Sequence, residues 1–254
     1  MVEWRTKLDT FLLDFVHTND IIGILVCGSY ITGNPSNHSD LDVHIVLDDN
    51  VNYRERGNRI IDGFLIEYFC NPPRQIIKYF EDDIQDSSLM AQTQFATGKI
   101  ICDKTGEIKS LKDKALEMIG HFYENTAIFM SERIKYDLWD MLDDLQDAYE
   151  NNKPDLDFLY FNLLNRLISN YMGCINRPYH FKTILGNINS NIVREKYLLK
   201  ELPHIPVNDL IERCIKAVDR AEKMEVYQCL TNEILNRFGG FDVDKFKLKS
   251  DVEV

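Results

Sequence analysis

Apolar and polar positions in the first part of the chain follow patterns that are typical of β-strands. Residues 21–27 form a short, nearly continuous apolar run, as expected for a buried strand. Residues 41–47 alternate instead, so their leucine, valine and isoleucine side chains share one face of the predicted strand. The opposite face carries Asp40, Asp42 and His44. The alternation therefore predicts one face in a hydrophobic core and a polar floor on the other.

A β-hairpin is expected around the pair Asp62-Gly63, because two apolar runs flank it and an Asp-Gly pair favours a tight turn. The returning strand carries Glu67 between apolar residues. Acidic residues are disfavoured inside strands, so Glu67 needs a reason to be there. A place beside Asp40 and Asp42 on a neighbouring strand supplies one. The alternatives are a solvated strand face for Glu67 and, for the two aspartates, a turn cap and an edge-strand charge.

The rest of the chain shows mainly helical periodicity. An amphipathic first helix is expected within residues 1–17, and two short helices should follow the hairpin before a last strand at residues 100–102. Beyond residue 104, helices are expected at residues 108–120, 121–150, 155–173, 207–221 and 221–238. The predicted fold class is α+β, with a small mixed-sheet domain at residues 1–104 and an all-α helical bundle at residues 105–254.

Asp40 and Asp42 are the strongest candidates for chemistry. Residues i and i+2 of a strand point to the same side, so both carboxylates are aimed at one point. Two close anions repel each other unless a cation or a proton lies between them, and hard oxygen ligands suit Mg²⁺. The turn at Gly28-Ser29 lies shortly before them in the chain, and a Mg²⁺ ion beside such a turn indicates nucleotide phosphates.

Charge and composition narrow the class of partner. The 254 residues include 41 acidic and 29 basic ones, which gives a formal net charge of −12. This charge disfavours a nucleic-acid binder, which needs a basic surface, and suits a cationic small molecule. The longest apolar runs are too short for a membrane span, and the N-terminal segment lacks the pattern of a signal peptide.

Six cysteines are scattered along the chain without a Cys-x-x-Cys pair, which indicates a reduced, cytoplasmic protein without a zinc site. All six are expected to be buried small hydrophobic residues. They are Cys27, Cys70, Cys102, Cys174, Cys214 and Cys229.

Taken together, Gly28-Ser29, a variable loop, Asp40-Leu41-Asp42 and the later Glu67 resemble the motif of the nucleotidyltransferase superfamily, whose fold is shared with DNA polymerase β. The resemblance covers roughly residues 20–70. A compact N-terminal nucleotidyltransferase domain followed by a helical half is similar to the antibiotic nucleotidyltransferases that modify aminoglycosides and lincosamides.

The resemblance implies a Mg²⁺-dependent transfer of a nucleoside monophosphate to a hydroxyl of a small acceptor, with release of pyrophosphate. The donor is expected to be a nucleoside triphosphate, with ATP as the first choice, and the acceptor a cationic antibiotic such as an aminoglycoside. One or two Mg²⁺ ions, and catalysis itself, are assigned to Asp40, Asp42 and Glu67. Nucleotide binding is assigned to Gly28, Ser29 and Ser39.

Four questions stay open at this point. The acceptor could instead be a protein or an RNA end, or the chain could be a non-catalytic nucleotide-binding or toxin–antitoxin-like module. The net charge of −12 disfavours RNA, and the intact set of carboxylates disfavours a degenerate copy. His44 is either a structural histidine or a ligand contact, and a homodimer is compatible with the sequence. Basic residues that could contact phosphate are Arg74, Lys78, Lys99 and Lys182.

Overall fold

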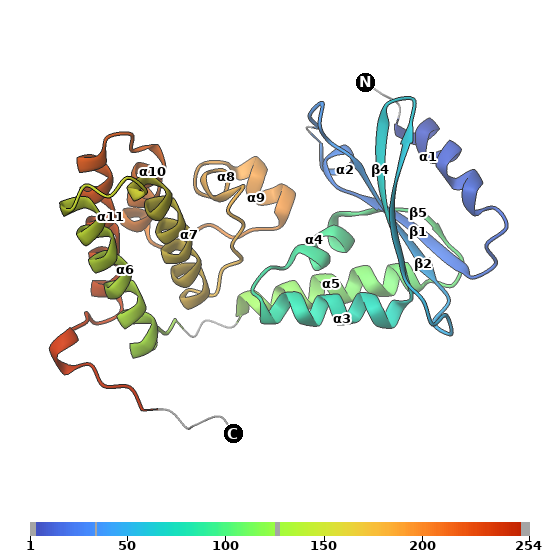
Figure 1. Cartoon of the computed structure of the whole chain (residues 1–254). Coiled ribbons are helices and arrows are strands. Elements are labelled where there is room, and N and C mark those ends of the chain that lie inside the picture. The colour runs from blue at the N-terminus through green and yellow to red at the C-terminus, as the bar shows by residue number, and fades with distance from the viewer. Residues whose placement is uncertain (1–3, 34, 125–127, 250–254) are drawn as a thin grey trace. The chain divides into compact units, whose positions relative to one another are not determined.

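The computed structural model describes residues 4–33, 35–124 and 128–249 of the chain. It divides into two compact units (Figure 1). Each unit has its own hydrophobic core. The first unit comprises Met1–Glu124 with Glu195–Leu198, and the second comprises Asn125–Arg194 with Leu199–Val254.

A mixed five-stranded sheet forms the centre of the first unit, in the order β3-β4-β2-β1-β5. The strands are β1 (Ile21–Cys27), β2 (Leu41–Leu47), β3 (Glu55–Ile61), β4 (Phe64–Asn71) and β5 (Lys99–Asp103). Strands β2 and β4 are parallel, whereas the other neighbouring pairs are antiparallel. With the helices described below, this sheet confirms the predicted α+β class and its mixed sheet.

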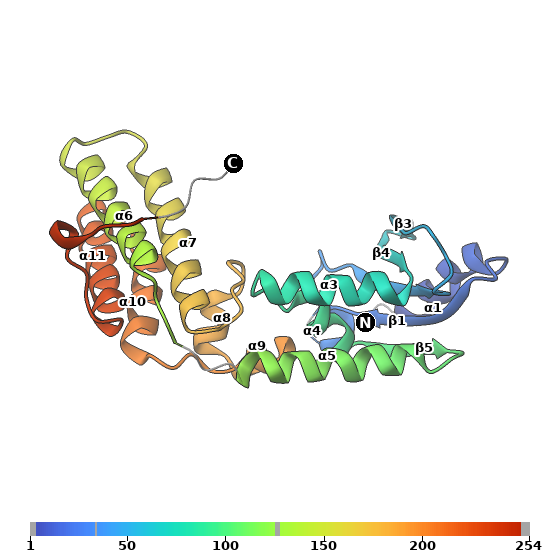
Figure 2. The same ribbon diagram turned by 90° about the horizontal axis from the view of Figure 1, so that it is seen from below.

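Helices cover both faces of this sheet. They are α1 (Trp4–Leu12), the short 3₁₀ turn η1 (Leu13–Phe15), α2 (Ser29–Thr32), α3 (Pro73–Gln85), α4 (Met90–Thr97) and α5 (Glu107–Glu124). Helix α1 lies on one face, and α3, α4 and α5 lie on the other (Figures 1 and 2). Leu8 and Phe11 of α1 belong to the core on its side of the sheet, and the other three helices contribute to a second core. The predicted polar floor is therefore wrong for the later part of β2, because helices bury Val46 completely and leave His44 only 8% exposed.

The turn between β3 and β4 has the geometry that the Asp-Gly pair predicts. Asp62 has φ of 48° and Gly63 has φ of 78°, and two successive positive φ angles are characteristic of a type I′ turn. This turn sets the antiparallel register from Ile61↔Phe64 to Glu55↔Cys70. The hairpin prediction is confirmed.

The second unit is helical. Its elements are α6 (Glu132–Glu150), α7 (Leu156–Cys174), α8 (Ile184–Asn189), α9 (Asn191–Tyr197), α10 (Ile205–Lys216), α11 (Arg220–Arg237) and the 3₁₀ turn η2 (Val243–Lys245). The end of α9 is grouped with the first unit. The core includes the fully buried rings of Tyr160, Tyr171 and Tyr227.

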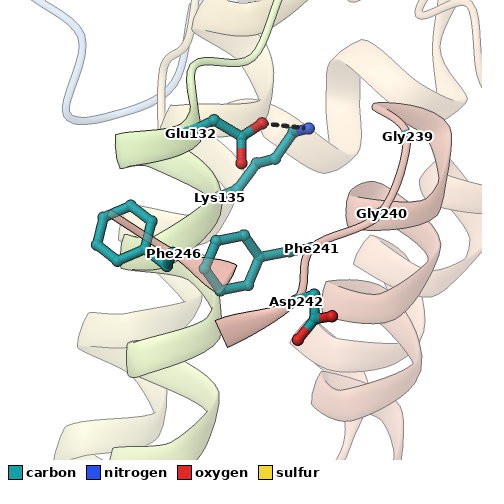
Figure 3. Close-up of a pocket in the computed structure, with 7 residues that line it drawn as sticks. All are labelled: Glu132, Lys135, Gly239, Gly240, Phe241, Asp242 and Phe246. Atoms are coloured by element: carbon teal, nitrogen blue, oxygen red, sulfur yellow. Dashed lines mark ion pairs between the residues drawn. The ribbon is translucent and has the colours of Figure 1, made fainter. Parts of the chain in front are cut away.

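The segment after α11 packs against α6, where Phe246 stacks on Tyr136 with ring centroids 4.5 Å apart. A shallow hollow of about 440 Å³ lies beside it, and its Lys135 ammonium is 2.8 Å from the Glu132 carboxylate (Figure 3). This ion pair neutralises the lysine, so the hollow does not present an unpaired reactive cation at that position.

Two expectations about the helices need correction. The single helix expected at residues 121–150 is interrupted, because α5 ends at Glu124 and α6 begins only after Ser131. The Ser131 side chain caps α6 by accepting a hydrogen bond from the amide of Ile134 at 3.3 Å. Helices α8 and α9 were not predicted. Residues 1–3 of the expected first helix and residues 125–127 of the long one lie outside the described residues.

The division between the units also differs from the boundary expected at residues 104 and 105. It falls after Glu124, because α5 packs its buried Ile108, Leu111 and Ala115 into the core beneath the sheet. Helix α5 is therefore part of the first unit, whereas its periodicity alone had assigned it to the helical bundle.

Two further features concern the state of the cysteines and the length and polarity of the helices. All six cysteines are unpaired, and Cys102 and Cys229 depart from the expected burial, being partly exposed and exposed, respectively. Every helix in the described ranges is too short or too polar to cross a membrane.

Candidate active site

Three carboxylates converge at one end of β2 and β4. Asp40 directly precedes β2, Asp42 is the second residue of that strand, and Glu67 is paired with Asp42 in the parallel β2–β4 register. One oxygen atom from each side chain lies within 4.8 Å of the other two. Oxygen ligands lie about 2.0–2.6 Å from Mg²⁺ or Ca²⁺, so this spacing suits a single divalent ion bound by all three. We call these three residues the carboxylate triad.

Electrostatic repulsion within the carboxylate triad shows in Asp42. The pKa of Asp42 is raised to about 6. Burial is the largest cause, the nearby charges of Asp40 and Glu67 contribute further, and Arg56 partly offsets the increase. Burial, followed by the charges of Asp42 and Asp40, also raises the pKa of the Cys27 thiol. The site therefore concentrates more negative charge than its surroundings neutralise, and a bound cation would relieve that excess.

Gly28 allows the main chain to pass directly beside Asp42. Its φ of 80° and ψ of −166° belong to a region that only glycine adopts readily, and a Cβ atom there would collide with Asp42 Oδ2. The next residue, Ser29, begins the four-residue helix α2, whose first turn is closed by amide hydrogen bonds of Ile31 and Thr32 to the Gly28 carbonyl, both at 3.1 Å. The structure thus brings the predicted Gly28-Ser29 turn to the carboxylate triad.

Ser39 stabilises the loop that precedes Asp40. Its hydroxyl accepts a hydrogen bond from the Ser36 amide at 2.8 Å, and its own amide donates to the Ser36 carbonyl at 3.1 Å. These two bonds close a turn immediately before the carboxylate triad. A nucleotide contact by Ser39 stays a prediction.

Arg56 is a site residue that the sequence analysis missed. Its Nη2 lies 2.5 Å from Glu67 Oε1, its Nε lies 3.1 Å from the same oxygen, and its guanidinium carbon is 4.9 Å from the centre of the Phe69 ring. The sequence did contain a signal for this contact. Counting back along β3 from the Asp62-Gly63 turn pairs Arg56 with Phe69, which follows Glu67 by two residues and therefore shares a face of β4 with it. Arg56 brings a positive charge to the edge of the carboxylate triad.

Two members of the carboxylate triad, Asp42 and Glu67, line a cavity of about 510 Å³, which is in the usual size range for small-molecule sites. We call it the carboxylate cavity. Asp42, Glu67 and Arg56 line it on the sheet side, and Asp82 and Asp83 line it near the end of α3. Its walls therefore carry more acidic than basic groups.

The basic residues suggested by sequence have other contacts. The Arg74 guanidinium donates to Asp49 Oδ1 at 3.2 Å and to the Val51 carbonyl, and Lys78 Nζ lies 2.7 Å from Asp82 Oδ1. Lys99 Nζ is 5.9 Å from the centre of the Trp4 ring, and Lys182 belongs to the second unit. Arg56 is the basic residue that the structure places in ion-pair contact with the carboxylate triad.

Comparison with known proteins gives little that bears on function. No family model matches the chain, and no curated protein matches it. Among solved structures, the chain is similar to a protein from Exiguobacterium sibiricum that is described as nucleotidyltransferase-like, with 10% sequence identity and a TM-score of 0.46. The similarity covers 92% of this chain and 75% of the other.

Proposed function

We propose that this protein is a Mg²⁺-dependent nucleotidyltransferase, which transfers a nucleoside monophosphate from a nucleoside triphosphate to a hydroxyl of a small acceptor and releases pyrophosphate. The convergence of Asp40, Asp42 and Glu67, with one oxygen of each within 4.8 Å of the others, carries this proposal. The glycine turn beside it supports the proposal, because the missing side chain of Gly28 gives the Asp42 carboxylate room directly beside the main chain.

Each residue of the site has a distinct role in this reaction. Asp40 and Asp42 bind the metal, and Glu67 either completes its coordination or accepts the proton of the attacking hydroxyl. When bound, Mg²⁺ supplies charge neutralisation for the triphosphate and polarises the attacking oxygen. Arg56, which is in ion-pair contact with Glu67, keeps a positive charge beside the phosphate that is transferred. The Gly28-Ser29 turn holds the triphosphate tail.

A cationic acceptor, such as an aminoglycoside, is the substrate class we propose. The acidic walls of the carboxylate cavity support this, since Asp82 and Asp83 of α3 line it together with Asp42 and Glu67. The net charge of −12 also attracts cations over longer distances.

The experiment is an assay of pyrophosphate release with Mg²⁺, each of the four ribonucleoside triphosphates, and a panel of aminoglycosides and lincosamides. We expect acceptor-dependent release by the wild-type protein and its loss in Asp40→Asn, Asp42→Asn and Glu67→Gln. Asp9→Asn is the matched control, because Asp9 is an exposed carboxylate on α1. Full activity of both Asp40→Asn and Asp42→Asn would refute the mechanism. Nucleotide binding without release would indicate a macromolecular acceptor or a binding module.

A further inference from the structure

A second cavity adjoins the carboxylate cavity. It has a volume of about 530 Å³ and shares five lining residues with the first, namely Arg56, Phe69, Tyr79, Ala91 and Gln94. It extends along the same face of the sheet to His44 on β2, and α3 and α4 supply its other walls. We call it the His44 cavity. Because the two cavities have these walls in common, one elongated ligand can occupy both.

His44 gives the cavity an unsatisfied polar group. The side chain is only 8% exposed, and its Nε2 atom is buried without a hydrogen-bond partner among the described protein groups. Buried polar atoms are nearly always paired in folded proteins, so a bound partner is expected at Nε2.

Packing holds the imidazole ring in this orientation. His44 stacks on Phe69 with ring centroids 5.1 Å apart and an interplanar angle of 21°. Phe95 lies on it at a centroid distance of 4.8 Å with an angle of 56°. Two aromatic neighbours leave the ring little freedom to turn toward solvent. The unpaired nitrogen is therefore a built feature of the cavity wall.

The remaining walls suit a flat ring with hydrogen-bonding edges. Phe69 and Tyr79 provide aromatic surface, and Asn71 and Gln94 provide side-chain amides that can both donate and accept hydrogen bonds. The carboxylate of Glu55, which also lines the cavity, accepts a hydrogen bond from the Tyr68 hydroxyl at 2.6 Å. Aromatic walls with amide and imidazole groups recognise the edge and the face of a heteroaromatic ring together.

Two arginines mark the anionic end of such a ligand. Arg54 and Arg56 both line the His44 cavity, and Arg56 also lines the carboxylate cavity. Arg54 Nη1 donates to the Tyr79 hydroxyl at 2.9 Å, which keeps its charge at the wall. Guanidinium groups bind phosphate well, so a ligand with a flat ring at one end and phosphates at the other matches the two cavities.

We infer that the His44 cavity binds a nucleobase, with His44 and Gln94 on the hydrogen-bonding edge of the base and the phosphates directed toward Arg56 and the carboxylate triad. This inference rests on the proposed function, and it adds the residues that recognise the base. The base belongs either to the triphosphate donor or to a nucleoside acceptor. Both sources have the same chemistry in this cavity, and competition between probes distinguishes them.

The test compares binding of probes with and without a base. Isothermal titration in Mg²⁺ would use the α,β-methylene analogues of the four nucleoside triphosphates, inorganic tripolyphosphate and the free nucleosides. The main variant is His44→Phe, which keeps a ring between Phe69 and Phe95 but removes Nε2. Gln94→Leu is a second variant that does not alter that packing, in case the first one fails to fold. His121→Phe, at an exposed position on α5, is the matched control.

The wild-type protein should bind at least one triphosphate analogue more tightly than tripolyphosphate. Loss of one buried hydrogen bond should weaken that analogue about 10-fold in His44→Phe and in Gln94→Leu, with tripolyphosphate affinity unchanged. A free nucleoside that competes with the analogue assigns the cavity to the donor. One that binds without competing, and loses affinity in His44→Phe, assigns it to the acceptor.

Two failures can be told apart. Unchanged affinity of both variants for every analogue and nucleoside would overturn the nucleobase inference, and the proposed function would stand if tripolyphosphate binding still required Asp40 and Asp42. Tripolyphosphate binding that is absent from the wild-type protein, or that persists in Asp40→Asn/Asp42→Asn, would overturn the proposed function. In that case, analogue binding that still depends on His44 would leave the nucleobase site standing.

Discussion

At the scale of single residues, Asp42 is held in an environment that disfavours its charge. Burial and the neighbouring carboxylates raise its pKa from 3.8 to about 6. Between these two pH values the folded protein binds more protons than the unfolded chain, so its free energy of unfolding falls as pH rises. Above about pH 6, the ionised Asp42 makes the metal-free protein less stable than the same protein with a neutral side chain at this position.

We therefore predict that Asp42→Asn stabilises the metal-free protein above about pH 6, by up to about 3 kcal/mol, and that the difference disappears near pH 4. Urea unfolding in the presence of a chelator, followed by Trp4 fluorescence in a Trp139→Phe background, measures this in the unit that contains the site. Asp9→Asn serves as the control. An equal pH dependence in Asp42→Asn and the parent would contradict the raised pKa.

Gly28 and Gly33 provide a matched pair for testing the close approach to Asp42. Both have positive φ, 80° and 88°, but only at Gly28 would a Cβ atom strike Asp42, whereas nothing lies within 4 Å of a Cβ at Gly33. Both alanine variants should lose about 1–3 kcal/mol from backbone strain. Gly28→Ala should lose a further 1–3 kcal/mol or so from overpacking and should also bind Mn²⁺ more weakly. Equal effects of the two substitutions on stability and on Mn²⁺ affinity would argue against a role for the contact.

At the scale of secondary structure elements, two strand registers assemble the site. The parallel β2–β4 register places Asp42 beside Glu67, and the type I′ turn between β3 and β4 places Arg56 opposite Phe69. A slip of one residue in either pairing would turn the side chains of a whole strand to the other face of the sheet. The site therefore depends on registers that are set some distance from its own residues.

Helix α4, which carries Gln94, is held at its C-terminal end by a lysine from α5. Lys112 Nζ donates hydrogen bonds to the carbonyls of Phe95, Ala96 and Gly98 at 2.9, 2.9 and 2.6 Å. Burial of the Lys112 ammonium group lowers its pKa. A single ammonium group thus satisfies three carbonyls at the helix end, where intrahelical donors are missing.

Lys112→Met should leave these carbonyls without a partner and destabilise the first unit by roughly 2–3 kcal/mol. Hydrogen exchange should become faster in the amides of α4, which form part of the cavity walls. Lys109→Met is the control, because Lys109 is exposed on the same helix. The proposed restraint would be disproved by exchange rates in α4 that are the same for the two variants.

At the scale of the whole molecule, the carboxylate triad and both cavities around it are built from residues of the first unit. The two tryptophans fall in different units, with Trp4 on α1 and Trp139 on α6. Each unit can therefore be followed separately in a variant that keeps only its own tryptophan. A ligand that binds only the folded first unit should stabilise that unit by mass action.

Mg²⁺ at about 100 times its dissociation constant should raise the unfolding free energy reported by Trp4 by about 2.7 kcal/mol, and removal of the ion with a chelator should reverse the change. The unfolding transition reported by Trp139 should be shifted less by Mg²⁺. The Asp40→Asn/Asp42→Asn variant should show no Mg²⁺ effect on Trp4. If Mg²⁺ stabilised this double variant as much as the parent, the ion would be bound elsewhere.

Local sequence was sufficient to predict the strands and the hairpin and to single out the candidate carboxylates. The alternation of residues 41–47 and the Asp62-Gly63 pair act over a few residues, so their consequences could be predicted without knowing the fold. The same is true of the α+β class, because the change from strand-like to helical periodicity is visible along the chain. The roles assigned to Gly28, Ser29 and Ser39 stay predictions.

Tertiary structure decided what local patterns could not. A place for Glu67 beside Asp40 and Asp42 was expected from the sequence, but the parallel pairing of β2 with β4 that provides it is specified by no short-range signal. His44 is polar by pattern, yet α3 and α4 bury it, because packing of the second sheet face outweighs the alternation of a single strand. Helix α5 joined the first unit for a similar reason, since its apolar stripe can pack against either a sheet or a bundle. Periodicity determines which face of an element is buried, whereas the partner that buries it is chosen by contacts across the whole chain.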